Sequence, residues 1–238
     1  MHPALDRVLL TRLTAPLRPF YRRYPFTSPV SIRSADDRGC VDMDLGFFCN
    51  RVPKAANSTV MTNLARLKFG ADVASREAKQ MFATPARLNA AEVARFEQLF
   101  KFTVVRNPYT RTLSAYLDKV ERRARREGRE SSFRAFLLSL KEGALYRNAH
   151  WAPQSALMLI PVEKFDFIGK VESLEQDLEA IKRRIRPDLE QPVTSFRGNA
   201  TGAGGKLRAY YDDESIALVR DIYRRDFEAF HYDVKFVA

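Results

Sequence analysis

The sequence predicts an α/β fold in three layers, with a central parallel sheet and helices on both faces. Two stretches support this prediction, at residues 45–68 and 100–126. Each begins as an apolar, strand-like run, reaches a basic residue near its end, and continues through a short loop into a helical pattern. Because the carboxyl ends of parallel strands lie along one edge of a sheet, where ligands bind, we expect the two basic residues to be neighbours.

Length and charge restrict the possible organisation and partners. The 238 residues suit one well-buried domain, which we place at residues 45–238, after an N-terminal arm at residues 1–44 that holds many of the prolines. Lys and Arg total 40 and Asp and Glu 29, so the formal net charge is +11. A surface of this kind attracts an anion: nucleic acid, a membrane surface, a nucleotide or an acidic glycan.

The few cysteines and histidines, and the lack of long apolar runs, argue against disulfide-rich, zinc-binding and membrane-spanning proteins. Two cysteines are too few for a disulfide framework, and with three histidines the chain is a poor candidate for a zinc site, so we expect no metal. No apolar run approaches the roughly 20 residues that a membrane span needs, and the N-terminus lacks an apolar signal core. We therefore expect a cytoplasmic protein without a transmembrane segment.

The first strand-to-helix turn has the features of an anion site. A strand at 45–52 is followed by Lys54 and by a helix at 57–68, whose first turn carries Ser58 and Thr59. The unpaired N–H groups at a helix start, together with the helix dipole, favour an anion. The Walker pattern, however, requires glycines and a Gly-Lys pair that this turn lacks. The turn alone therefore does not identify the anion.

The second turn repeats this layout. A strand at 100–106 ends at Arg106, and Pro108 suits the first position of a helix at 109–126. Between the two units, residues 71–99 are expected to be helical, with an interruption at Pro85. The dense positive cluster from Arg122 to Arg129 has two interpretations: a solvated helix end, or a binding surface for a polyanion or an acidic acceptor.

The remaining pattern predicts alternating elements without a repeat or an interdomain linker. We expect, in order, a helix at 132–140, a polar loop at 146–154, strands at 157–160 and 165–169, a helix at 172–185 and a last helix at 213–230. The glycine-rich segment 197–206 is either a flexible connector or a lid whose backbone approaches a ligand.

Five segments resemble, in the same order, the sulfotransferases that use 3′-phosphoadenosine 5′-phosphosulfate (PAPS), in particular the family that contains the Golgi carbohydrate sulfotransferases. They are residues 51–59, 102–116, 150–154, 167–172 and 222–232. The second of these, which runs from Phe102 through Arg106 and Ser114 to Tyr116, is the most specific. The resemblance covers roughly residues 45–233 and leaves the arm unmatched. It implies a P-loop-like fold and makes residues 45–238 a sulfotransferase domain.

The resemblance also implies a set of binding residues for the donor. The first turn would hold the 5′-phosphosulfate through Arg51, Pro53, Lys54, Ala55, Ala56, Asn57, Ser58 and Thr59. Arg106 and Ser114 would hold the 3′-phosphate, and Arg197 and Lys206 would close over the nucleotide. No metal is needed, because lysine and arginine supply the positive charge.

Sulfuryl transfer resembles phosphoryl transfer, in which fixed positive groups stabilise charge that develops on oxygen atoms. By this analogy Lys54 would neutralise the leaving oxygen. The acceptor hydroxyl also needs a base, for which His150 is the best histidine. Some relatives have a base between the two phosphate loops, where this chain has no histidine. The competing candidates are Glu77, Glu92 and Glu97.

We therefore expect an enzyme that transfers a sulfuryl group from PAPS to a hydroxyl of a carbohydrate or of another acceptor. The positive surface is compatible with an anionic acceptor. We expect no nucleic acid partner, and the oligomeric state is not predicted. One alternative is a nucleotide-triphosphate-dependent kinase, which the missing Gly-Lys-Ser/Thr loop disfavours. The other is a non-enzymatic, basic nucleic-acid-binding protein, for which binding would depend steeply on salt.

Overall fold

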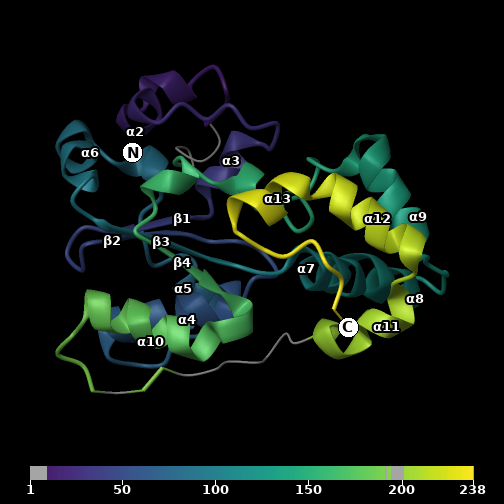
Figure 1. Cartoon of the computed structure of the whole chain (residues 1–238). Helices are drawn as coiled ribbons and strands as arrows, with labels where there is room; N and C mark the ends of the chain where they lie inside the picture. The colour runs from purple at the N-terminus through teal and green to yellow at the C-terminus, as the bar shows by residue number, and fades with distance from the viewer. Residues whose placement is uncertain (1–9, 191, 194–200, 238) are drawn as a thin grey trace.

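A computed structural model describes residues 10–190, 192–193 and 201–237, and it confirms the α/β class, with helices on both faces of a four-stranded sheet (Figure 1). The strands are β1 (Gly39–Asp42), β2 (Phe47–Asn50), β3 (Phe100–Val105) and β4 (Phe167–Lys170). The α-helices are α2 (Pro19–Arg23), α3 (Ile32–Asp36), α4 (Asn57–Phe69), α5 (Ser75–Ala78), α6 (Ala90–Phe96), α7 (Pro108–Ala115), α8 (Arg122–Arg126), α9 (Phe133–Ser139), α10 (Leu174–Ile185), α11 (Leu207–Tyr210), α12 (Asp213–Ile222) and α13 (Arg224–Ala229).

The sheet has the order β1-β2-β3-β4 and is mostly parallel. Strands β2, β3 and β4 run in the same direction, whereas β1 pairs with β2 in the antiparallel direction. The two strands that precede the predicted turns, β2 and β3, are direct neighbours, so both turns lie at the same edge. Strand β1 lies before residue 45, so the sheet begins within the segment that the sequence assigns to the arm.

Alternation along the strands divides the core into two layers, because successive side chains point to opposite faces. Phe47 and Cys49 of β2 pack with α4 and α10, which lie below the sheet in Figure 1. Phe48 packs on the opposite face, with residues of α2 and α6. Both faces of the central strands are therefore covered, as parallel sheets require.

The N-terminal arm is part of the upper layer. The ring of Phe20 in α2 is fully buried and lies 5.0 to 5.3 Å, centroid to centroid, from the rings of Tyr21, Tyr24 and Phe96. The hydroxyl of Tyr21 donates a 2.8 Å hydrogen bond to the buried carboxylate of Asp36. The arm therefore contributes core residues to the domain.

The helix after β3 is longer than α7 alone. It continues without a break through a π-helical turn at Tyr116–Glu121 into α8, which reproduces the predicted helix 109–126. Together with α9, α11, α12 and α13, α7 encloses a separate apolar cluster at the far end of the sheet (Figure 1). The described residues include no helix that is both long enough and apolar enough to cross a membrane.

Three predicted elements differ from the structure. Residues 157–160 are not a strand, because the side-chain amide of Asn50 donates to the carbonyl of Leu157 and accepts from the N–H of Leu159, which occupies the groups that a strand would pair. Residues 71–99 contain only the short helices α5 and α6 and a 3₁₀ turn at Pro85–Arg87. The last predicted helix is interrupted at Tyr223, between α12 and α13.

Candidate active site

The predicted turns enclose one cavity of about 530 Å³ at the carboxyl edge of the sheet. This volume is typical of a small-molecule site. The predicted residues that line it are Pro53, Lys54, Ala56, Asn57, Ser58, Thr59, Arg106, Ser114 and His150. Residues 201–205 of the glycine-rich segment also line it, which favours the lid interpretation of that segment over the connector. The fold therefore brings both turns and the 146–154 loop around the same space.

The loop after β2 makes its tight turn without glycine. Lys54 and Ala56 both have left-handed backbone conformations, with φ of 68° and 51°. Such conformations cost non-glycine residues roughly 1–2 kcal/mol each. Helix α4 then begins at Asn57, directly after Ala56, and its first-turn N–H groups have no acceptor within the helix. The glycine-free sequence therefore forms a tight turn that leaves the first N–H groups of α4 unpaired within the helix, and it does so by adopting strained conformations.

The ammonium group of Lys54 lies inside the cavity beside a carboxylate. Its Nζ is 3.2 Å from Oδ2 of Asp118, and the lysine side chain is only 9% exposed. Burial lowers the pKa of Lys54, while Asp118 opposes this shift. Asp118 also pairs with Lys119 at 3.1 Å and with Arg122 at 2.9 Å. One carboxylate thus balances three cations.

Arg106 connects the two turns. Its guanidinium Nη1 donates to the carbonyl of Lys54 at 3.3 Å, and its Nε donates to Oγ1 of Thr110 at 3.0 Å. Its backbone exchanges two further hydrogen bonds, of 2.9 and 2.8 Å, with the side-chain amide of Gln154. The strand end, the first turn and the 146–154 loop therefore hold one another in place.

Ser114 faces the cavity from the second turn of α7, as the sequence predicts. It is buried, and its Oγ accepts a 3.1 Å hydrogen bond from the hydroxyl of Thr201. This contact links α7 to the lid segment. Ser114 and Arg106 both line the cavity, Ser114 from α7 and Arg106 from the end of β3.

His150 is held as a neutral imidazole with a defined tautomer. The Oδ1 atom of Asn148 accepts from the backbone N–H of His150 at 3.0 Å and lies 2.8 Å from its Nδ1. Because an N–H can only donate, that atom is the amide oxygen, and Nδ1 must carry the ring proton. The other ring nitrogen, Nε2, is then an acceptor. Burial, with repulsion from Lys119, lowers the pKa of His150 to about 4.

Arg111 supports the site from behind, a role that sequence reasoning missed. The side chain is fully buried and donates to the carbonyls of Pro53, Ala149 and Ala152 at distances of 3.0, 3.2 and 2.9 Å. These carbonyls flank Lys54 on one side and His150 on the other. A guanidinium can bridge them because its donors are held in a rigid plane.

Several predicted residues lie away from the cavity. Arg51 is buried and donates to the carbonyl of Asp37, Ala55 packs in a core cluster with Val52, and Lys206 is exposed at the end of the lid segment. None of these three lines the cavity, and Arg197 is outside the described residues. The sequence grouped these residues by chain position, which does not show whether a side chain faces the cavity, the core or the surface.

The competing base candidates Glu77, Glu92 and Glu97 do not line the cavity either. Glu92 closes a capping box at the start of α6, and Glu97 accepts from the hydroxyl of Tyr24 at 2.6 Å. Glu77 is exposed on the short helix α5. Of the predicted base candidates, His150 alone lines the cavity.

Three charged residues at the cavity were not predicted: Lys79, Asp118 and Lys119. Lys79, after α5, donates from Nζ to Oγ of Ser58 at 3.0 Å. Asp118 follows Ser114 by one helical turn, a spacing that places both on one side of a helix. That signal was present in the sequence, whereas the position of Lys79 depends on tertiary packing.

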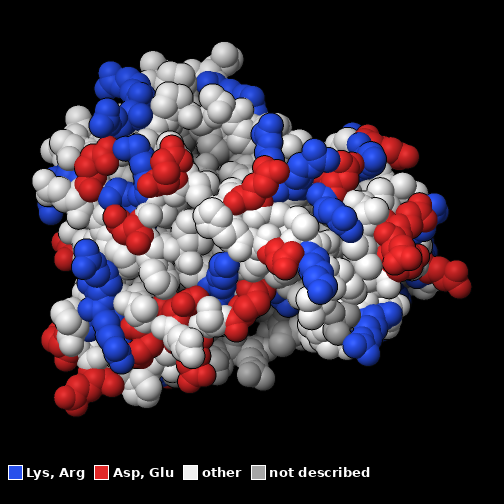
Figure 2. Space-filling model, viewed as in Figure 1, with Lys and Arg blue, Asp and Glu red and all other residues white. Residues whose placement is uncertain are grey.

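Most arginines of the basic cluster pair with carboxylates close to them along the chain. Arg123 and Arg129 bond to Glu127, and Arg125 bonds to Glu121. Only Arg122 of this cluster lines the cavity. On the face shown in Figure 2, many acidic side chains lie beside basic ones. These contacts favour the interpretation as a solvated helix end over a continuous surface for a polyanion.

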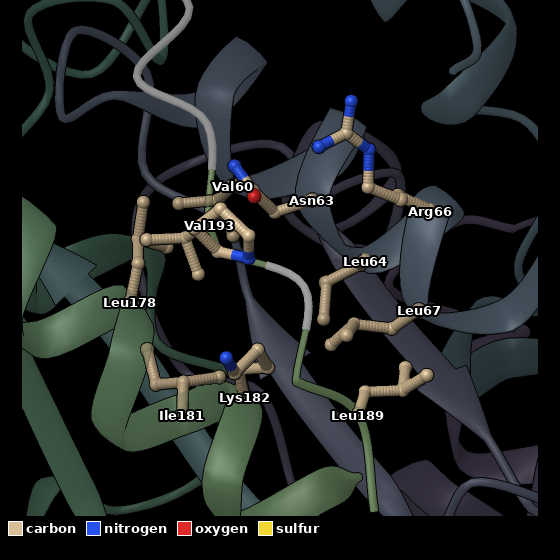
Figure 3. A pocket seen from close by; sticks show the side chains of 11 residues that line it. Val60, Asn63, Leu64, Arg66, Leu67, Leu178, Ile181, Lys182, Leu189 and Val193 are labelled. Carbon is tan, nitrogen blue, oxygen red and sulfur yellow. The ribbon is translucent and has the colours of Figure 1, made fainter. Parts of the chain in front are cut away.

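Two other hollows lack the features of the active site. An apolar cavity of about 20 Å³ lies between α4 and α10, lined by Val60, Leu64, Leu178 and Ile181 among others (Figure 3). It is too small for a nucleotide. A cleft of about 950 Å³ lies between residues 23–29 and residues 221–225, away from the strand ends. The described residues include no group of His, Cys, Asp or Glu side chains suited to a metal ion.

These features define an α/β protein with a cationic site at the carboxyl edge of its sheet. A family model described as "Sulfotransferase family" matches residues 38–233, which is most of the chain. The chain therefore belongs to the sulfotransferase family, and the predicted family and enzyme class are confirmed. No curated protein and no solved structure is similar enough to this chain to count as a match.

Proposed function

We propose that this sulfotransferase moves a sulfuryl group from PAPS to a hydroxyl group of a carbohydrate. The observation that carries the proposal is the pair of cationic turns at neighbouring strand ends, with Lys54 in one and Arg106 in the other, around a single cavity. A donor with a phosphosulfate at one end and a ribose 3′-phosphate at the other needs two such separated cationic positions.

The residues present fit this donor. The first-turn N–H groups of α4, together with Lys54, Ser58 and Thr59, suit the 5′-phosphosulfate, and Arg106 with Ser114 suits the 3′-phosphate. The side-chain amide of Asn57 also lines the cavity and has a buried oxygen without a hydrogen-bond partner in the structure. Buried polar atoms are rarely unpaired, so this atom favours a ligand with hydroxyl or amino donors.

The donor supplies the sulfuryl group and a phosphate that can leave. Lys54 stabilises the negative charge that develops on the oxygen shared by sulfur and phosphorus. Nε2 of His150 accepts the proton that the acceptor hydroxyl loses as its oxygen bonds to sulfur. The neutral tautomer of His150 suits this role, because its acceptor nitrogen is free at neutral pH.

A carbohydrate acceptor is supported by the resemblance and by the charge of the cavity. Lys79, Lys119 and Arg122 line the cavity in addition to the residues assigned to the donor. They provide positive charge that an acidic saccharide can use. We therefore place the acceptor among anionic saccharides, which this positive charge would attract.

Donor recognition is tested by thermal unfolding and calorimetry with 3′,5′-adenosine bisphosphate, the product nucleotide. We expect it to raise the melting temperature well above the effect of AMP, since a ligand at ~100 times its Kd adds roughly 2.7 kcal/mol. Arg106→Ala should remove this preference, because the 3′-phosphate then loses its cation. Equal stabilisation by AMP and by the bisphosphate in the unmodified enzyme would contradict the donor assignment.

The acceptor is tested by transfer of labelled sulfate from PAPS across a panel of neutral saccharides, acidic saccharides, lipids and small alcohols. We expect transfer to acidic saccharides, and none by Lys54→Ala, because the leaving oxygen then has no cation. Lys206→Ala, which changes an exposed lysine outside the cavity lining, is the matched control and should retain turnover. Exclusive labelling of lipids or small alcohols would show that the acceptor class is wrong.

A further inference from the structure

One carboxylate, that of Asp118, lines a cavity whose other charged lining residues are lysines and arginines. The side chain of Asp118 is 15% exposed, and its oxygen atoms lie within 3.2 Å of nitrogen atoms of Lys54, Lys119 and Arg122. A negative charge here opposes the binding of any anion. The small contribution that a surface ion pair makes to stability does not explain why a carboxylate lies at this position.

The local backbone directs this carboxylate into the cavity. Asp118 lies in the π-helical turn Tyr116–Glu121, which interrupts the α-helical pattern between α7 and α8. Turns of this kind are rare and occur frequently at functional sites. Glu121, in the same turn, instead faces Arg125 and the hydroxyl of Tyr210 and does not line the cavity.

We propose that Asp118 is an internal counter-ion for Lys54: it keeps the lysine ammonium oriented and protonated in the donor-free enzyme and releases it when an anion binds. Asp118 is thus a positioning residue. The first part of this proposal concerns the free protein alone, whereas the second rests on the proposed function.

The charges around Lys54 explain why a counter-ion is needed. Burial lowers the pKa of its ammonium, and Lys119 in the π turn and Arg106 at the end of β3 lower it further. His150, from the facing loop, is neutral above a pH of about 4 and does not help. Of these described neighbours, Asp118 alone raises the pKa of Lys54 and so favours its charged form. Without Asp118, Lys54 would lose its proton at a lower pH.

The carboxylate can release Lys54 without becoming unpaired. Although burial raises the pKa of Asp118, the cations Lys54 and Lys119 bring it below its usual value, so the group stays ionised. When Lys54 turns to an incoming anion, Lys119 and Arg122 remain in contact with Asp118. A buried charge left without a partner would be costly, and this arrangement avoids that cost.

The first test measures the titration of Lys54 by ¹³C NMR of its Cε in the free protein, with the signal assigned through Lys54→Arg. In Asp118→Asn the signal should titrate about one to three pH units lower than in the unmodified protein, the usual effect of an adjacent opposite charge. Asp118→Ala should shift it in the same direction. Glu121→Gln, in the same turn, should leave it unchanged. An unchanged Lys54 titration in both Asp118 variants would overturn the counter-ion proposal.

The second test measures binding of 3′,5′-adenosine bisphosphate by calorimetry at pH 6 and low salt. Asp118→Asn should bind it roughly five- to ten-fold more tightly, because no carboxylate then competes for Lys54. Unchanged or weaker binding would overturn the release step. If the unmodified enzyme does not bind the nucleotide, the proposed donor is wrong, while the Lys54 titration still decides whether Asp118 is its counter-ion.

Discussion

The imidazole of His150 is neutral at physiological pH because its surroundings oppose a second ring proton. Burial is the largest cause, followed by the positive charges of Lys119, Arg38 and Lys54, and together they lower its pKa to about 4. A neutral ring is a competent proton acceptor, although a weakly basic one. The negative charge of a bound dianion would offset the positive charge of these cations. Donor binding should therefore raise the pKa of His150 toward the range in which a base is most effective.

The role of His150 as the base is tested by His150→Asn, whose amide N–H can still donate to Asn148 but which has no counterpart of Nε2. We expect turnover to fall by about 10²- to 10⁴-fold, with unchanged affinity for 3′,5′-adenosine bisphosphate. His231→Asn is the matched control, because His231 is exposed and lies outside the cavity lining. Normal turnover in His150→Asn would assign the base to another group.

The same variant should change the acid stability of the protein. The pKa of His150 is lower in the folded protein than its ordinary value of 6.5, so its contribution to stability is fully present above pH 6.5 and is lost as the pH falls toward 4. The loss is of the order of 3 kcal/mol over this window. Urea unfolding between pH 7 and pH 4 should show a shallower decline in the free energy of unfolding for His150→Asn.

At the scale of elements, the loop between β2 and α4 has an unusual sequence for its shape. Its two left-handed residues, Lys54 and Ala56, are positions at which glycine would be unstrained. Strain of this kind persists where the surrounding structure requires it, and here the first turn is held by Arg111 and Arg106. The absence of glycine therefore does not argue against a phosphate-binding turn.

This strain predicts an unusual response to glycine. Ala56→Gly should leave the free energy of unfolding unchanged or raise it by up to about 1 kcal/mol, because the strain that is relieved exceeds the added entropy of the unfolded chain. Ala94→Gly is the matched control, since Ala94 is exposed within helix α6, and it should lower stability by about 1 kcal/mol. Equal losses in the two variants, measured by urea unfolding, would show that position 56 is unstrained.

The elements that the sequence predicted well are those whose periodicity agrees with their packing. Helix α4 was expected at residues 57–68 and is observed as Asn57–Phe69, because Val60, Leu64 and Leu67 form one buried face. The run at 157–160 is as apolar as a strand, but a side-chain amide takes its backbone hydrogen bonds. The hydrophobic pattern of a sequence cannot reveal a side-chain partner for the backbone, and it cannot reveal a π-helical turn.

At the scale of the whole molecule, the arm and the domain form one structure. Tyr21, Phe20 and Ile32 of the arm belong to the same apolar cluster as Phe48 of the central strand. The sequence could predict that the two turns lie at one edge of the sheet, since the ends of neighbouring parallel strands meet there. The short apolar face of the N-terminal segment favours an arm packed across the domain, but the sequence does not show how many core residues the proline-rich segment supplies, because such packing leaves no local pattern.

The contribution of the arm is tested by Phe20→Ala. This change removes a fully buried ring and should lower the free energy of unfolding by about 3–5 kcal/mol, with a single transition still observed by circular dichroism and by fluorescence. Leu17→Ala is the matched control, because Leu17 lies in the same arm and is 76% exposed, so its effect should be small. A small effect of Phe20→Ala would mean that the arm contributes little to the stability of the core.

The buried guanidinium of Arg111 has a consequence for folding itself. Its three carbonyl partners are 58, 41 and 38 residues away along the chain. The two halves of the site, which are the turn after β2 and the 146–154 loop, therefore adopt their positions only when these distant segments have come together. A partly folded chain would thus possess neither half in its final form. Nucleotide binding can therefore serve as a reporter of complete folding: during refolding it should appear with the slowest structural phase, and not with early helix formation.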